Sequence, residues 1–177
     1  RPPRSTLFPY TTLFRSLFPS TKSKTKNIDV KTVIEKVHNL YKRAFKENRI
    51  TVEYSLSTRP LVVKTTDAVL LQVFINLFDN SLYWLKSVNG ERKILITLDG
   101  DRQRMIFSDS GPGIKPDDID YIFEAFYSGK GEEGRGLGLY IARQLLDRYD
   151  YSINLAEFSK DRILKGANFV LEFVKEG

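Results

Sequence analysis

Apolar residues recur at the spacing of helices in several parts of the chain. Over residues 30–45 they return every three or four positions and Asp29 stands where an N-cap belongs, so we expect a helix there. A longer helix is predicted over residues 67–87, a helix start at Pro116, and a last helix over about 137–149. Helical segments are therefore distributed along the chain from residue 30 onward.

Strand-like runs lie between and after these helices. ITVEYSL and LVVKT are separated by Arg59-Pro60, KILITL and RMIFSD flank the turn signal DGD, and two more runs are predicted near 151–157 and 168–174. Strands and helices mixed in this order predict an α+β sandwich and not a doubly wound sheet.

The net charge of +6 is confined to the first 26 residues. That segment holds six Lys and Arg and no acid, while the rest of the chain carries 22 Lys plus Arg against 22 Asp plus Glu. The part of the chain that is expected to fold is formally neutral, so its charge does not support binding to nucleic acid. We expect no nucleic-acid partner.

The chain has no cysteine and a single histidine, His38. This composition excludes disulfides, zinc sites of the Cys/His type, and every Ser-His or Cys-His nucleophile pair except one that uses His38. The most apolar run, AVLLQVFINLF, is interrupted by Gln72 and Asn76. It is shorter than the roughly 20 residues that span a bilayer, so we expect no membrane contact in this part of the protein.

The opening stretch TLFPYTTLFRS, residues 6–16, has the periodicity of neither a strand nor a helix. Back-translated with permitted codons, it resembles a common sequencing-library adapter read in one frame. We therefore predict that residues 1–16 are an artefact, that residues 17–26 are the remnant of a polar linker, and that residues 27–177 form one domain. On this interpretation the true upstream part of the gene has been lost and the chain is a fragment. The alternative interpretation is a genuine flexible N-terminal tail.

The long predicted helix has a polar face beside its apolar one. Asn76 and Asn80 lie one turn apart and point the same way, and Gln72, Asp79 and Tyr83 share their side. A solvated polar stripe would explain this pattern for the helix alone, but asparagine is a poor residue inside a helix. An amide oxygen is a hard ligand that suits Mg²⁺, so the two amides are candidates for a metal or phosphate site.

A carboxylate and two glycines follow in FSDSGPGI. Asp109 ends a predicted strand, and Gly111 and Gly113 come directly after it. This arrangement presents a carboxylate beside backbone that a flat ligand can approach closely. Taken alone, the same residues are equally typical of an ordinary turn.

The segment GKGEEGRGLGLY contains the spacing GxGxxG, beginning at Gly129. No apolar strand precedes it, and Glu132 and Glu133 would stand where a pyrophosphate must bind, so we reject a dinucleotide-binding fold.

The glycines that follow lead into a helix. Gly136, Leu137 and Gly138 stand at its predicted start, where free N–H groups can face an anion. Lys130 and Arg135 lie in the preceding loop and are candidate phosphate contacts. A mobile loop with a flexible cap is the alternative interpretation.

These motifs occur in a specific order: NxxxN on a helix, DxGxG after a strand, IFEAFYS, and GxGLGL at a helix start. In this order they resemble the GHKL ATPase superfamily and, within it, the catalytic ATP-binding domain of sensor histidine kinases. The resemblance covers residues 27–177 and includes the closing GANFVLEF. It implies the Bergerat fold, a two-layer α/β sandwich with a mixed sheet, helices on one face, and ATP between the helices and a lid.

The resemblance also assigns roles to residues. It implies that Asn80 is the Mg²⁺ ligand, with Asn76 as its catalytic partner near the phosphates. Asp109 is implied to accept a hydrogen bond from the adenine amino group in a pocket lined by Gly111 and Gly113. The phenylalanine motif, which contains Phe123, and the lid supply the other candidates for ATP binding: Phe126, Lys130, Gly134, Arg135, Gly136, Leu137 and Gly138.

Position 76 separates branches of the superfamily. The gyrase, mismatch-repair and heat-shock-chaperone ATPases have a glutamate there that activates water, whereas the amide of Asn76 cannot accept a proton at neutral pH. Efficient ATP hydrolysis is therefore disfavoured. Phosphoryl transfer to a histidine depends less on a base than ATP hydrolysis does, because it depends chiefly on positioning and charge neutralisation.

We therefore expect a histidine kinase module that donates the γ-phosphoryl group of Mg-ATP to a histidine on a missing helical hairpin, and through it to a response regulator. The alternatives are an ATP-gated switch in a non-kinase ATPase and a serine kinase of the anti-sigma type. We expect a cytoplasmic location, because the domain must meet cytosolic ATP even where the parent protein is anchored in a membrane.

Two positions depart from the kinase pattern. Tyr83, followed by Trp84, stands where these kinases usually have a lysine or a similar polar residue, and Lys86 does not replace it directly. His38 is followed by Asn39 and lies on the first helix of the ATP domain itself. We expect it to pack at the edge of that helix and not to act as the phosphoryl acceptor.

Overall fold

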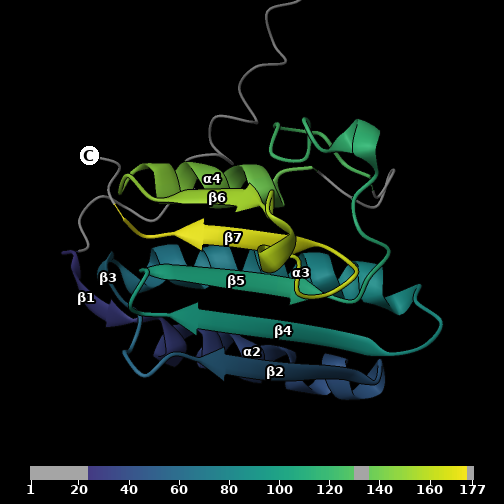
Figure 1. The fold of residues 1–177 in the computed structure, drawn as a ribbon, viewed down its shortest axis with the longest axis horizontal. Coiled ribbons are helices and arrows are strands. Elements are labelled where there is room, and N and C mark those ends of the chain that lie inside the picture. Colours follow the sequence, from purple (N-terminus) through teal and green to yellow (C-terminus); the bar gives the residue numbers. More distant parts are fainter. Residues whose placement is uncertain (1–23, 130–135, 175–177) are drawn as a thin grey trace, which may run out of the picture.

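The computed structural model describes residues 24–129 and 136–174 of the chain. In this part, a five-stranded sheet carries helices on one face (Figure 1). Its strands, in spatial order, are β2 (Ile50–Leu56), β4 (Arg92–Asp99), β5 (Arg104–Asp109), β7 (Asn168–Glu172) and β6 (Ser152–Leu155). The helices are α2 (Val30–Glu47), α3 (Asp67–Lys86) and α4 (Gly138–Asp147).

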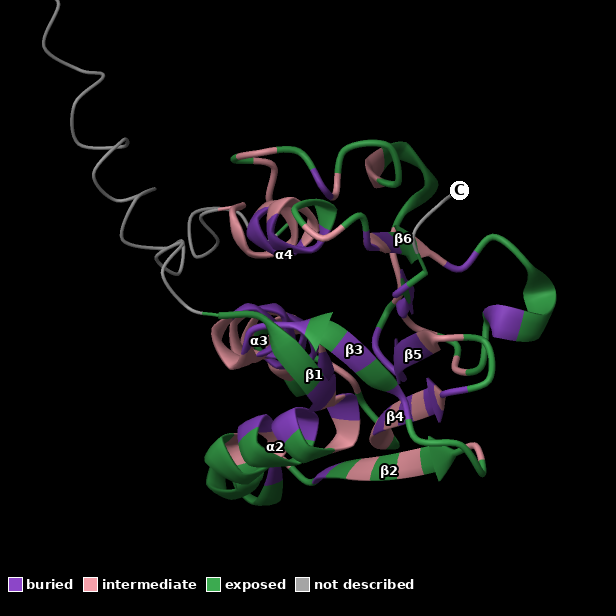
Figure 2. Ribbon diagram, turned by 90° about the vertical axis from the view of Figure 1, so that its left-hand side faces the viewer, coloured by how far each residue is buried: buried purple, intermediate pink, exposed green. Residues whose placement is uncertain are grey.

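The sheet is mixed, as predicted. β2 and β4 are parallel, and the other three neighbouring pairs are antiparallel. The predicted hairpin joins β4 to β5, with Asp99 opposite Arg104. The edge-on view in Figure 2 separates the layer of helices from the sheet, which confirms a two-layer α+β sandwich.

The structure has a second, two-stranded sheet, of which only one strand was predicted from the sequence. β3 (Val62–Thr65) pairs antiparallel with β1 (Lys26–Asp29), and Lys26 lies opposite Thr65. The sequence placed residue 26 in a linker and predicted no strand there, because four residues with one buried side chain are too short to show an alternating pattern. The folded domain therefore begins at or before Lys26.

The predicted helix at Pro116 is reduced to a single turn. Only η1 (Pro116–Asp118) is helical, and it is a 3₁₀ turn followed by further turns and bends. Ile119 is 46% exposed and Tyr121 is 53% exposed, so no continuous apolar face is buried that would stabilise a longer helix. The proline and the acidic residues mark a helix start correctly, but the packing does not extend it.

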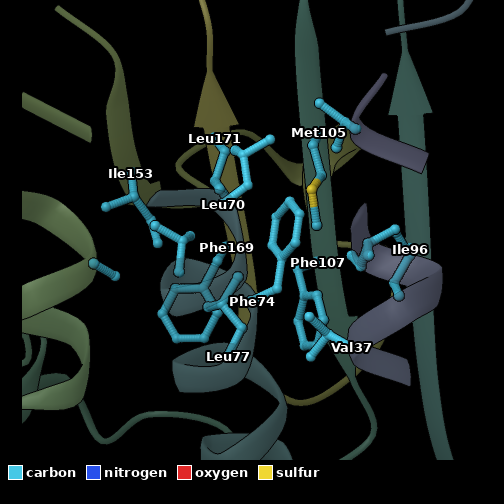
Figure 3. Packing of buried hydrophobic residues seen from close by; sticks show 14 of the residues in the cluster. Val37, Leu70, Phe74, Leu77, Ile96, Met105, Phe107, Ile153, Phe169 and Leu171 are labelled. Carbon is cyan, nitrogen blue, oxygen red and sulfur yellow. The ribbon is translucent and has the colours of Figure 1, made fainter. Parts of the chain in front are cut away.

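Helix α3 is the centre of the core. Leu70, Phe74 and Leu77 point toward Phe107 on β5 and Phe169 on β7 in Figure 3, and all five side chains are fully buried or nearly so. By length and composition α3 could cross a membrane. Its apolar composition is explained by its place against the sheet and between α2 and α4 (Figure 2).

Candidate functional site

A cavity of about 1020 Å³ opens between α3, the start of α4 and the segments that follow β5. The predicted polar face of α3 lines it, together with aromatic residues near the end of that helix. The α3 residues on its wall include Gln72, Asn76, Asp79, Asn80, Tyr83 and Trp84. A cavity of this size with a few polar groups is typical of sites for small organic ligands.

Asp109, at the end of β5, presents a buried carboxylate to this cavity. Its Oδ1 accepts hydrogen bonds from the main-chain N–H groups of Gly111 at 2.9 Å and Ala167 at 3.2 Å. Its Oδ2 accepts one from the hydroxyl of Ser81 on α3 at 2.8 Å. Each carboxylate oxygen has two lone pairs, so Oδ1 is saturated and Oδ2 can accept one more hydrogen bond. The site therefore offers a ligand one fixed acceptor.

Burial raises the pKa of Asp109 above its ordinary value, and the hydrogen bonds from Ser81, Gly111 and Ala167 oppose this increase. The carboxylate form of this group is therefore lost at a higher pH than for an exposed aspartate. A ligand that donates to Oδ2 needs the carboxylate form, so its binding should weaken as the pH falls.

Two glycines allow the backbone to lie against this carboxylate. A Cβ atom at Gly111 would lie 2.8 Å from Oδ1 of Asp109, and one at Gly166 would lie 2.4 Å from the same atom. Any larger residue at these positions must displace the carboxylate or its backbone. Gly113 serves differently, since its φ of +80° is a conformation that favours glycine.

Asn76 and Asn80 both line the cavity, as expected from their spacing. The Nδ2 atom of Asn76 is buried and has no hydrogen-bond partner among the described residues. A buried amide without a partner is unfavourable unless a ligand satisfies it. A Cβ atom at Gly138 would lie 3.5 Å from Oδ1 of Asn76, so the structure brings this amide to the start of α4.

The N-terminus of α4 faces the same cavity. Leu137, Gly138 and Leu139 line it, and no side chain of the described residues caps this helix end. A helix of this length concentrates partial positive charge at its N-terminus, which suits an anionic ligand.

Gly136 directly precedes Leu137, the residue before α4. It has a φ of +65°, and its carbonyl oxygen accepts a hydrogen bond from the N–H of Phe126 at 2.9 Å. This bond joins Gly136 to Phe126, which precedes the glycine-rich segment. The predicted contacts Lys130, Gly134 and Arg135 lie outside the described residues.

The two phenylalanines of IFEAFYS have different environments. Phe123 is buried, contacts the ring of Phe169, and has the guanidinium of Arg143 3.9 Å from its ring centre. Phe126 is 59% exposed, and its side chain does not line the cavity. A direct contact of Phe126 with a nucleotide stays a prediction.

The residues around Asp109 that were not expected from the sequence include Ser81, Trp84 and Ala167. Ser81 interrupts the apolar series of buried α3 positions, which was the one available signal for it. Trp84 lies close to both Gly111 and Gly129, where Cβ atoms would be 3.6 and 3.5 Å from its side chain. Trp84 therefore forms a wall between the Asp109 pocket and the start of the glycine-rich segment.

His38 takes the position expected for it, at the edge of the apolar face of α2. Its Nδ1 atom lies 3.0 Å from the hydroxyl of Tyr54, and its ring stacks on Phe78. Burial and the nearby charge of Lys42 lower the pKa of His38. It does not line the cavity.

Comparison with known proteins identifies the family. Residues 65–176 match the family described as histidine kinase-, DNA gyrase B-, and HSP90-like ATPase. The chain is 36% identical over 108 residues to the sensor protein ChvG of Rhizobium meliloti (strain 1021), which covers 56% of this chain and 18% of ChvG. The chain therefore spans about a fifth of that relative's length.

Solved structures show the same fold. The catalytic domain of histidine kinase ThkA superposes with a TM-score of 0.70 at 24% identity, covering 86% of this chain and 99% of ThkA's. Full-length ShkA in complex with AMPPNP gives a TM-score of 0.68 at 23% identity, covering 89% of this chain and 33% of ShkA's. The chain thus belongs to the histidine kinase-, DNA gyrase B- and HSP90-like ATPase family and has the fold of histidine kinase catalytic domains.

Proposed function

We propose that this domain binds Mg-ATP in the cavity and transfers its γ-phosphoryl group to a histidine on a separate helical hairpin of the parent protein. The bond between the γ-phosphorus and the β,γ-bridging oxygen breaks, a bond from phosphorus to a ring nitrogen of the histidine forms, and ADP leaves. The phosphohistidine then donates the group to an aspartate of a response regulator. The domain acts in the cytoplasm, where ATP is available.

One observation carries the proposal. The buried carboxylate of Asp109, the amides of Asn76 and Asn80, and the uncapped N-terminus of α4 all line one cavity. The carboxylate has a free acceptor for the amino group of adenine, and the start of α4 suits the phosphates. The ShkA structure, which contains AMPPNP, supports a nucleotide in a site of this fold.

The residues beside the expected phosphate position favour transfer over hydrolysis. Asn76 has an amide where a water-activating base would stand, and an amide cannot take a proton at neutral pH. The nearest acid along α3, Asp79, accepts a hydrogen bond from the hydroxyl of Tyr41 on α2. The carboxylate of Asp79 is therefore held by a hydrogen bond to α2.

The donor set of the cavity fits Mg²⁺ only as a partner of the nucleotide. The described residues contain no cluster of three or more His, Asp or Glu side chains that could hold a metal. Asn80 would supply one amide oxygen, and the phosphates and water would complete the octahedron. Bound there, Mg²⁺ would neutralise charge on the phosphates.

The acceptor experiment separates the proposed activity from its alternatives. The chain is incubated with γ-labelled ATP and a sensor-kinase helical hairpin supplied in trans, and the products are tested for stability in acid. We expect acid-labile, base-stable label on the hairpin, as for phosphohistidine. Rapid release of phosphate without the hairpin would identify a hydrolase, and acid-stable label on serine would identify a serine kinase.

ATP binding should weaken as the pH falls, at a higher pH than for a site built on an exposed aspartate. Below the raised pKa of Asp109, its carboxyl carries a proton, and this O–H donor faces the amino group of adenine, which is also a donor. Ser81→Ala removes a hydrogen bond that lowers this pKa. The pH midpoint of the loss of ATP binding should therefore lie higher in Ser81→Ala than in the unmodified chain. Calorimetric dissociation constants for Mg-ATP between pH 5 and 8 measure both midpoints.

The matched control for this experiment is Ser87→Ala, at the end of the same helix. Ser87 bonds to the carbonyl of Trp84 and not to Asp109. It should leave the midpoint unchanged. The free energy of unfolding of the ligand-free protein should change with pH in the opposite direction to ATP binding. Because the pKa of Asp109 is raised in the folded state, protonation of Asp109 stabilises the fold at low pH, and this stabilisation is lost as the pH rises through that pKa. Equal midpoints for the unmodified chain and Ser81→Ala would contradict this account of Asp109.

A further inference from the structure

Asp109 is held by the segment before β7 as well as by α3. The N–H of Gly166 donates to the main-chain oxygen of Asp109 at 3.0 Å, and the N–H of Asp109 donates to the oxygen of Ala167 at 2.9 Å. The N–H of Ala167 also donates to Oδ1 of the Asp109 side chain. The position of the carboxylate therefore depends on the conformation of residues 163–167.

One side chain organises this segment. Oδ1 of Asn168 accepts hydrogen bonds from the N–H groups of Ile163 at 2.9 Å and Leu164 at 3.1 Å. Its Nδ2 donates to the carbonyl oxygens of Leu164 at 2.8 Å and Gly166 at 3.1 Å. A side-chain amide has two donor hydrogens and two acceptor lone pairs, so all four positions are used within the turn.

Asn168 is itself fixed. It is 6% exposed, begins β7, and lies opposite Ser108, the residue that precedes Asp109. It does not line the nucleotide cavity, so its effect on a ligand must pass through other residues. The path is short, because Nδ2 bonds to Gly166 and the next residue, Ala167, bonds to the carboxylate.

We propose that Asn168 is a positioning residue for adenine selectivity, acting through Gly166 and Ala167 on Asp109. This proposal rests on the proposed function, that the cavity binds ATP. Adenine presents an amino donor to Oδ2, whereas guanine presents a carbonyl oxygen that a carboxylate repels. Discrimination between the two depends on a carboxylate that cannot rotate away, and the turn built by Asn168 prevents that rotation.

The test compares dissociation constants of the full chain for Mg-ATP and Mg-GTP, measured by calorimetry at pH 8. Asn168→Ala should reduce the preference for ATP over GTP about tenfold, which corresponds to the loss of about one well-placed hydrogen bond. A purely structural role would lower the melting temperature and the fraction of active protein but would leave the ratio of the two constants unchanged.

Val37→Ala provides the control for destabilisation. Val37 is fully buried on α2, which contributes no residue to the cavity. It should lower the melting temperature and keep the ATP preference. If Asn168→Ala does not fold, Asn168→Asp decides the question, because it keeps the size and the acceptor for Ile163 and Leu164 but places a carboxylate oxygen, which cannot donate, against the carbonyl oxygens of Leu164 and Gly166.

The outcomes distinguish this proposal from the proposed function. An unmodified chain that does not bind ATP overturns the proposed function and this proposal with it. An unmodified chain that binds ATP and GTP equally well leaves the proposed function standing and overturns the proposal on adenine selectivity. An unmodified chain that prefers ATP, together with Asn168 variants that keep the full preference, overturns the role of Asn168 alone.

Discussion

Asp109→Asn is expected to weaken Mg-ATP binding about 10- to 100-fold, since a hydrogen bond to a charged group contributes about 1.5–3 kcal/mol and 1.4 kcal/mol is a factor of ten. Asparagine keeps an oxygen for the N–H groups of Gly111 and Ala167, but its amide NH₂ replaces the free acceptor at Oδ2. A donor then faces the amino group of adenine. Calorimetry with Mg-ATP measures the loss.

The same substitution should preserve the fold. The hydroxyl of Ser81 can turn and accept a hydrogen bond from the new amide, and a buried charge is removed. The melting temperature of Asp109→Asn should therefore equal or exceed that of the unmodified chain. Asp101→Asn, in the exposed β4–β5 turn, is the matched control and should change neither quantity. Unchanged ATP affinity in Asp109→Asn would mean that the nucleotide does not use this carboxylate.

Long elements were predictable because their ends have local signals. Helix α2 begins after Asp29, whose side chain accepts a hydrogen bond from the N–H of Lys31, and α3 runs from Asp67 to Lys86 against a prediction of 67–87. The strand at Lys26–Asp29 lacked such signals, because it depends on pairing with β3. The turn at Pro116 has the local signal of a helix start but ends early, because the residues after it stay exposed.

Some residues of the candidate site were likewise predictable from the sequence, and others were not. A common site for Asn76, Asn80, Asp109 and Gly138 was implied by the family resemblance that the ordered motifs carry, and all four residues line one cavity. The groups that hold Asp109 were not expected. Ser81 lies 28 residues from it in sequence and Ala167 lies 58 residues from it. Their contacts arise from the packing of α3 and β7 on β5, and a single serine or alanine in a sequence carries no sign of such a partner.

Asn80→Ala is expected to remove the Mg²⁺-dependent part of ATP binding and to lower phosphoryl transfer about 100-fold or more, the scale of losing one preorganised charge-stabilising group. The side chain lines the cavity one turn after Asn76 and is the proposed protein ligand of the metal. Calorimetry with ATP in Mg²⁺ and in EDTA gives the binding effect independently of activity. The unmodified chain should bind more tightly with Mg²⁺, and Asn80→Ala should bind equally in both.

Two further variants sharpen this test. Asn89→Ala, at an exposed position after α3, is the matched control and should retain the full response to Mg²⁺. Asn80→Asp replaces the amide oxygen with a carboxylate oxygen, which is also a hard ligand, so part of the Mg²⁺ dependence should return. If Asn80→Ala keeps the response of the unmodified chain to Mg²⁺, the metal is held by the phosphates and water alone, and Asn80 is not its ligand.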